Sequence, residues 1–154
     1  MSNFVYGYVE TLNLPSVIKD IEQIVVNQPL GLITGSIDSL YNFPPSLLPH
    51  GNNVMVFSIC DSKQSNTASC LLDTLDYVVD LSNGLPRETR KRWELLLGLL
   101  SEIFKLEQVE KLYVALTEVE EIESVATLSL EELKEVTINN YEAPPNVLYI
   151  VEKR

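Results

Sequence analysis

The chain has 154 residues, 45% of them hydrophobic, and its 22 acidic and 11 basic side chains give a formal net charge of −11. This size suits one domain with its own core, so we expect a single globular domain over residues 1–154 rather than intrinsic disorder. The negative field repels phosphate backbones, which argues against direct nucleic-acid binding.

The first half of the chain predicts three strands and one helix. Residues 4–10 alternate with apolar side chains on both faces, which indicates a strand covered on both sides. A helix follows over about 15–27, capped by Asn13 and stopped by proline. Residues 30–37 predict a weaker strand because they hold two glycines. After a proline-rich loop, residues 53–60 predict a further strand.

The second half begins with an ambiguous segment. Residues 74–81 alternate like a half-exposed strand that would form a hairpin with 53–60, although the apolar spacing from Leu71 onward also fits a helix, so residues 71–81 are predicted as either. A long helix is predicted over about 86–107, apolar around nearly its whole circumference and therefore central to the fold. Strands are predicted over 111–117 and 146–152.

Two capping boxes lie between these last strands. Thr117 with Glu120, and Ser129 with Glu132, have the three-residue spacing that opens a helix. They predict short acidic helices over about 118–124 and 130–136.

The order of these elements predicts the fold class. We expect an α+β fold, with a single mixed, largely antiparallel sheet of five or six strands packed against the long apolar helix (about 86–107) and shorter helices. No internal repeat or domain boundary interrupts the pattern.

The residues typical of catalytic and metal sites are scarce. His50 is the only histidine, and with Cys60 and Cys70 it cannot complete a typical zinc site. Phosphate-loop, dinucleotide and nucleophile-elbow motifs are absent. We therefore expect no catalytic residue, no metal, no cofactor and no enzymatic activity.

Localisation follows from similar absences. No apolar run approaches the roughly 20 residues that cross a bilayer, and the first residues do not form a secretory signal. We expect a cytoplasmic protein that does not bind membranes. In that compartment Cys60 and Cys70 would stay reduced, with a disulfide between them as the alternative.

Basic residues gather at the start of the predicted long helix, at Arg87, Arg90, Lys91 and Arg92. The helix dipole disfavours cations there. This pattern favours ion pairs with nearby carboxylates, and an anion-binding site is the alternative.

Acidic residues gather in the last quarter of the chain, where residues 118–154 hold nine acids and three bases. They indicate either solvated helices or a surface that docks a basic partner, with a tyrosine as aromatic anchor. The candidate partner-binding residues are Asp76, Asp80, Glu118, Glu120, Glu121, Glu123, Glu131, Glu132, Glu135 and Tyr141.

These patterns favour a non-enzymatic, acidic cytosolic binding protein that neutralises or escorts a basic protein partner. An immunity protein or antitoxin that inhibits a cytotoxic nuclease toxin is the natural example, because opposite charge speeds encounter. The alternatives are a secretion chaperone, a homo-oligomeric structural subunit, and a small enzyme or ligand-binding domain. The last would assemble its site from His50, Asp38 and Tyr41 with Arg87 or Arg90. The sequence leaves the oligomeric state open.

Overall fold

A six-stranded mixed sheet forms the centre of the protein in a computed structural model that describes residues 4–62, 87–117, 121–136 and 146–153. Its spatial order is β2-β3-β1-β4-β6-β5. Only β5 and β6 run parallel, and the other neighbours are antiparallel. The predicted α+β class with a mixed sheet is confirmed. The strands are β1 (Phe4–Thr11), β2 (Gly31–Gly35), β3 (Val54–Cys60), β4 (Val109–Thr117), β5 (Ser124–Leu128) and β6 (Val147–Glu152).

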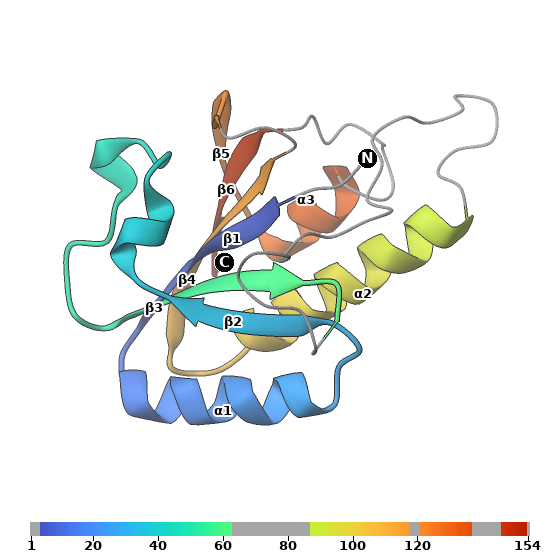
Figure 1. Cartoon of the computed structure of the whole chain (residues 1–154), viewed down its shortest axis with the longest axis horizontal. Helices are drawn as coiled ribbons and strands as arrows, with labels where there is room; N and C mark the ends of the chain where they lie inside the picture. The colour runs from blue at the N-terminus through green and yellow to red at the C-terminus, as the bar shows by residue number, and fades with distance from the viewer. Residues whose placement is uncertain (1–3, 63–86, 118–120, 137–145, 154) are drawn as a thin grey trace.

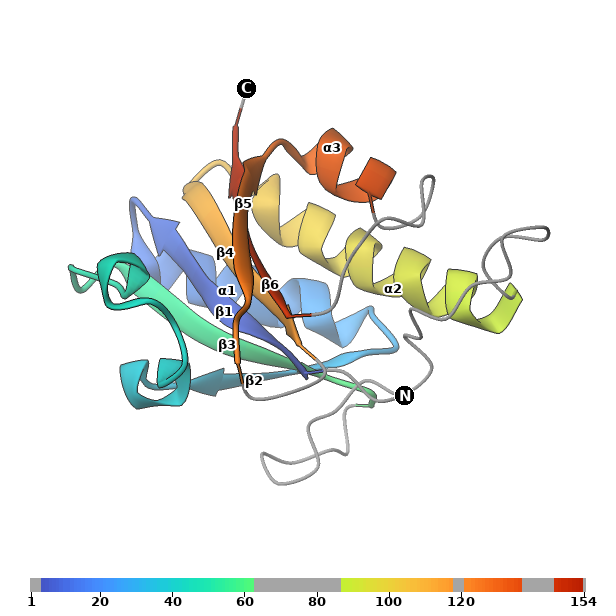
Figure 2. The same cartoon turned by 90° about the horizontal axis from the view of Figure 1, so that it is seen from above.

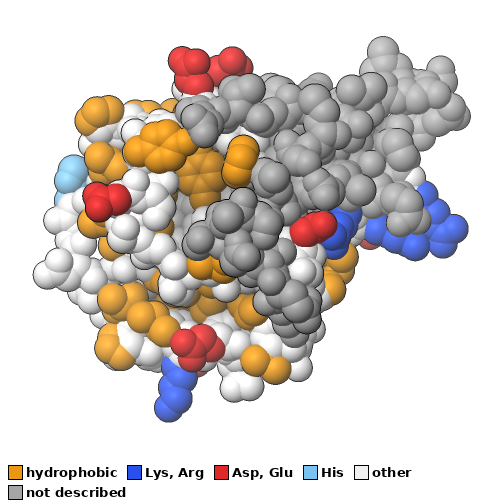
Figure 3. All heavy atoms as spheres, in the orientation of Figure 1, with side chains coloured by type: hydrophobic (Ala, Val, Ile, Leu, Met, Phe, Trp, Pro, Cys, Tyr) orange, Lys and Arg blue, Asp and Glu red, His pale blue; other side chains and the backbone are white. Residues whose placement is uncertain are grey.

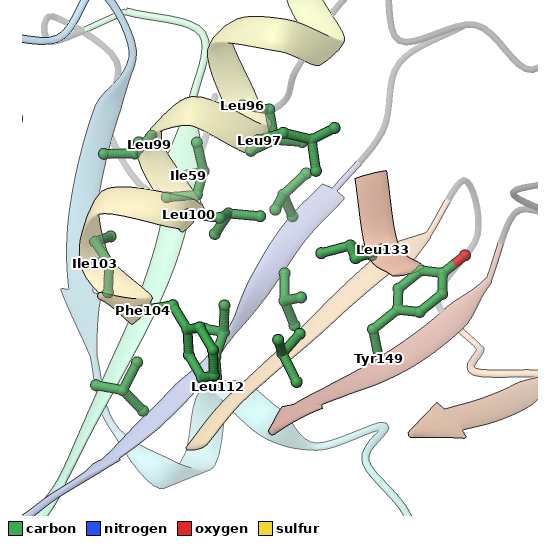
Figure 4. Packing of buried hydrophobic residues seen from close by; sticks show 14 of the residues in the cluster. Ile59, Leu96, Leu97, Leu99, Leu100, Ile103, Phe104, Leu112, Leu133 and Tyr149 are labelled. Atoms are coloured by element: carbon green, nitrogen blue, oxygen red, sulfur yellow. The ribbon is translucent and has the colours of Figure 1, made fainter. Parts of the chain in front are cut away.

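Within the described part of the chain, three helices cover one face of this sheet: α1 (Leu14–Val26), α2 (Arg87–Phe104) and α3 (Leu130–Lys134) (Figure 1). The helices and the strands beneath them share one buried apolar cluster. Figure 4 shows Ile59 of β3 among the leucines of α2, Leu112 of β4 below them, and Leu133 of α3 beside Tyr149 of β6. All four of these residues are buried, so the main core lies between the helices and the sheet.

The opposite face of the sheet is covered by two short 3-10 helices, η1 (Ile37–Leu40) and η2 (Pro45–Leu47). Leu40 and Phe43 pack there against Tyr8 and Tyr113 in a second buried cluster. Strand β1 therefore has apolar neighbours on both faces, which confirms the prediction of a strand covered on both sides.

The first helix begins where its sequence predicts. The Asn13 side chain accepts a hydrogen bond from Ser16 N at 3.2 Å and so caps α1. Val17 and Ile21 of α1 are buried in the main core. Among the described helices, none has both the length and the apolar character that spanning a membrane requires.

The prediction of a long helix that is apolar all round is wrong. Helix α2 ends at Phe104, and Lys91, Glu94, Gly98 and Glu102 are exposed on it. These four positions recur at intervals of three or four residues, which is the spacing of one helical face. The apolar residues thus form a broad stripe towards the sheet, and the opposite side of α2 faces solvent.

Two predictions between residues 53 and 124 need correction: the hairpin with residues 53–60 and the helix over about 118–124. Strand β3 pairs with β1 on one side and β2 on the other, so no hairpin partner can join it. Residues 74–81 themselves lie outside the described residues. The helix predicted over about 118–124 is also wrong in its described part, because residues 121–123 are not helical and Ser124 begins β5. Residues 118–120 lie outside the described residues.

Cys60 differs from the expectation of a reduced thiol. It is buried at the end of β3 and is disulfide-bonded. Cys70, the only other cysteine of the sequence, lies outside the described residues. Because disulfides persist mainly in oxidising environments, cysteine usage no longer supports a reducing compartment.

Candidate partner-binding surface

The acidic residues predicted to bind a partner fall into two groups. Glu121, Glu123, Glu131, Glu132 and Glu135 lie on or beside β5 and α3. We call residues 121–135 the β5–α3 surface. The remaining candidates lie outside the described residues: Asp76, Asp80, Glu118, Glu120 and Tyr141.

Asn146 fixes the beginning of this surface. Its backbone is left-handed, with φ at 67°, a conformation that asparagine adopts more readily than most residues. Asn146 N donates to Leu116 O at 2.8 Å, and Asn146 O accepts from Glu123 N at 2.8 Å. One residue therefore ties the end of β4 to the start of β5, and it holds Glu123 at that end of the strand.

The other end of the surface is fixed by the capping box that the sequence predicts. Glu132 N donates to Ser129 Oγ at 3.2 Å, and Ser129 N donates to Glu132 Oε1 at 3.3 Å. Leu130 and Leu133 bury the inner side of α3 in the main core. Glu132 is thus half-buried and engaged in the cap, which makes it a structural residue rather than a partner contact.

Four carboxylates remain exposed on the β5–α3 surface: those of Glu121, Glu123, Glu131 and Glu135. The Glu131 side chain is 84% exposed and lies 3.8 Å from Lys134 Nζ, a distance and exposure at which an ion pair contributes little. Residues 121–135 hold five acids and one base, a net charge of −4. The potential at this edge of the sheet is accordingly negative.

The strand between these carboxylates carries no charge. Its residues are Ser124, Val125, Ala126, Thr127 and Leu128, which span about 17 Å at the usual rise of a strand. Ala126 and Leu128 pack towards the main core, whereas Val125 is 44% exposed and Thr127 is exposed. The surface is therefore an uncharged strand with acidic groups beyond both ends.

A groove of about 450 Å³ lies where β5 leads into α3. Lys153 Nζ donates to Leu106 O at 2.9 Å and lies 5.6 Å from the centre of the Phe104 ring, so this cation is held in place. Apolar atoms make up most of the lining, and the groove could receive an apolar side chain next to the carboxylates of Glu131 and Glu152. Its lining residues are Phe104, Lys105, Ser129, Leu130, Glu131, Glu152 and Lys153.

The basic cluster of α2 forms an ion pair, but with a partner that sequence reasoning missed. Arg92 pairs with the carboxylate of Asp61 and donates to Asp61 O at 3.4 Å. Asp61 directly follows β3, and no short-range spacing links residues 61 and 92. Arg92 thereby joins α2 to the end of β3.

The alternative site around His50 is not assembled as predicted. His50, Asp38 and Tyr41 are exposed residues of the segment that includes η1 and η2 (His50 is the pale blue side chain in Figure 3). Arg87 and Arg90 lie at the start of α2, on the opposite side of the molecule in both cartoon views (Figures 1 and 2). No group of three or more histidine, cysteine or acidic side chains within the described ranges could hold a metal ion.

A tyrosine cluster on the second face has a structural role. Tyr8 and Tyr113 stack with ring centres 4.3 Å apart, Tyr8 Oη donates to Leu47 O at 2.7 Å, and Tyr113 Oη donates to Glu10 at 3.2 Å. Burial, followed by the neighbouring negative groups, raises the pKa of both tyrosines. Both phenols are therefore neutral at physiological pH, and Tyr8 ties η2 to the sheet.

Comparison with known proteins gives no relative from which a site could be transferred. No protein-family model matches the chain, and neither a curated protein nor a solved structure is significantly similar to it.

Proposed function

We propose that this chain is a non-enzymatic binding protein that captures a basic protein partner through the β5–α3 surface. One observation carries this proposal: Glu121, Glu123, Glu131 and Glu135 are exposed around a single uncharged edge strand. Opposite charge accelerates the encounter of two proteins and orients them. The exposed Val125 and the apolar groove beside α3 supply apolar contact area, which charged groups do not provide.

A toxin domain is one partner of this class. A cytotoxic nuclease needs a basic surface because it binds phosphate backbones, and an acidic immunity protein or antitoxin can cover that surface. The net charge of −11 of the whole chain would also attract a basic partner.

The test uses two variants with the same change in net charge. Glu123→Lys with Glu131→Lys reverses two charges and brings the net charge of the β5–α3 surface from −4 to zero, whereas Asp20→Lys with Glu22→Lys reverses two exposed charges of α1. The partner is first captured on the wild-type chain from a native cell extract and identified by mass spectrometry. We expect its association rate to fall at least about ten-fold for the first variant and to stay near wild type for the second.

Salt provides an independent measurement. The association rate of the wild-type chain should fall steeply as ionic strength rises, because exposed charges are screened. A rate that is insensitive to salt, or an equal loss in both variants, would show that the β5–α3 carboxylates do not guide binding. A small molecule retained by the purified chain in native mass spectrometry would favour a ligand-binding domain instead.

A further inference from the structure

We infer that the outer edge of β5 binds its partner by strand addition, so that an extended basic segment of the partner becomes a seventh strand of the sheet. This inference rests on the proposed function and specifies how the partner is held. It depends on the backbone of β5, on the absence of proline, lysine and a bulge from its five residues, and on the charges beyond its ends.

The backbone of β5 has hydrogen-bonding groups that face away from the sheet. Ser124 N donates to Asn146 O at 3.4 Å, and the parallel register then runs without a shift from Ser124 opposite Val147 to Leu128 opposite Val151. Since backbone groups alternate in direction along a strand, those of Ser124, Ala126 and Leu128 face β6. The N–H and C=O groups of Val125 and Thr127 therefore face outward.

No described strand pairs with this outer edge, since β5 is the last strand in the sheet order. Figure 2 looks onto this side of the molecule, and no described helix or strand crosses β5 there. Natural edge strands are commonly protected by proline, lysine or a bulge. The sequence of β5 contains none of the three, and the β-branched Val125 and Thr127 favour an extended backbone.

The charges select the occupant of this edge. A second copy of the chain pairing through β5 would bring two surfaces of net charge −4 against each other. The carboxylates of Glu123 and Glu131 would then face carboxylates of the other copy and repel them. A basic strand is attracted instead, because lysine or arginine beyond each of its ends lies near the carboxylates that flank β5. The fitting segment thus has about five uncharged residues between basic residues, matching the ~17 Å length of β5.

Strand addition requires backbone hydrogen bonds, whereas charge attraction alone does not. The probe is the peptide Lys-Lys-Val-Thr-Val-Thr-Val-Lys-Lys, and its control is the same peptide with methylated backbone nitrogens at its five central residues. Both carry the same charge, but the control cannot donate in a ladder. We expect the full chain to bind the control at least about ten-fold more weakly. The unmodified peptide should slow amide exchange at Val125 and Thr127.

A matched pair of protein variants tests the same edge. Thr127→Pro removes one outward N–H and leaves the bonds to β6 in place, as prolines on edge strands do. Thr127→Ala removes the side chain and keeps that N–H. We expect the proline variant to lose about ten-fold in affinity for the unmodified peptide and the alanine variant to bind it nearly as wild type. Circular dichroism of both variants should match that of the wild type.

The outcomes separate this inference from the proposed function. Equal binding of the two peptides, still abolished by Glu123→Lys with Glu131→Lys, would overturn strand addition and leave charge-guided binding in place. Failure of the chain to bind either peptide at low salt would overturn both. A dimer of the chain alone in light scattering, dissociated by Thr127→Pro, would replace the basic strand with a second copy.

Discussion

The centre and the edge of the sheet differ in burial and in the number of neighbouring strands. Strands β1 and β4 lie at the centre, where each has a neighbour on both sides and Tyr8, Val9 and Val114 are almost fully buried. Strand β5 has one described neighbour, and Val125 and Thr127 are exposed on it. The centre supplies the burial on which stability depends, and in the proposed function the edge presents its backbone groups and carboxylates to a partner.

This difference separates stability from binding in the same sheet. The carboxylates of the β5–α3 surface are exposed, so their replacement removes no buried contact. Substitutions at the centre should therefore unfold the chain, and substitutions at the edge should mainly alter what it binds. The predictions below test that separation, beginning with the largest effect.

Gly7 is the position where the centre has the least space. A Cβ atom on Gly7 of β1 would lie 1.8 Å from Tyr113 O on β4, and a backbone oxygen cannot move aside without displacing its strand. We expect Gly7→Ala to lower the free energy of unfolding by at least about 3 kcal/mol. Denaturant titration followed by circular dichroism measures this loss.

Gly98 provides the control for this substitution. It is exposed on α2, and an added Cβ would meet no atom within 4 Å. Gly98→Ala should stabilise the chain by about 0.5–1 kcal/mol, because alanine is the better helix former. A Gly7→Ala variant within about 1 kcal/mol of wild type would show that β1 and β4 can separate easily and would remove the distinction between centre and edge.

Tyr149 lies between the two regions, on β6, and it predicts how stability changes in alkaline solution. Burial raises the pKa of Tyr149 to about 12 from an ordinary value of 10.0. Below pH 10 the phenol is neutral in both the folded and the unfolded chain. Between pH 10 and about 12 the unfolded chain ionises first, so folding loses up to about 1.4 kcal/mol per pH unit from this group.

Removing this hydroxyl isolates its contribution. Tyr149→Phe should lose stability more slowly than wild type from pH 10 to about 12, whereas Tyr41→Phe, at an exposed position, should follow the wild-type curve. Urea titrations at a series of pH values measure the slopes. Identical slopes for wild type and Tyr149→Phe would mean that Tyr149 ionises as readily in the folded chain as in the unfolded chain.

Local patterns in the sequence predict much of the centre. The alternation in β1, β3, β4 and β6 and the cap at Asn13 depend on neighbouring residues, and the structure confirms each of them. The order of the strands depends on contacts between distant segments, such as the pairing of β1 with β3 and β4. No local spacing encodes such contacts.

The edge was harder to predict because its signals compete. Ser124–Leu128 follows a run of glutamates and the spacing of Thr117 and Glu120, which favours a helix. The structure instead places these five residues beside β6, where Leu128 reaches the main core. Glu132 shows the same competition. Its carboxylate fits both a docking surface and a capping box, and in the structure it bonds to the backbone of Ser129 in the capping box.

The smallest predicted effect tests whether the edge of the sheet can unfold locally while the centre stays folded. Ser129→Ala removes the oxygen that accepts from Glu132 N at 3.2 Å, so α3 should lose about 1 kcal/mol of stability. Ser129→Asp, which supplies an equally good cap, should restore it. Hydrogen exchange of the alanine variant should quicken at residues 130–134 and remain slow in β1 and β4. If exchange quickens equally in all three elements, the edge and the centre open as one unit, and a partner that binds β5 would stabilise the whole sheet.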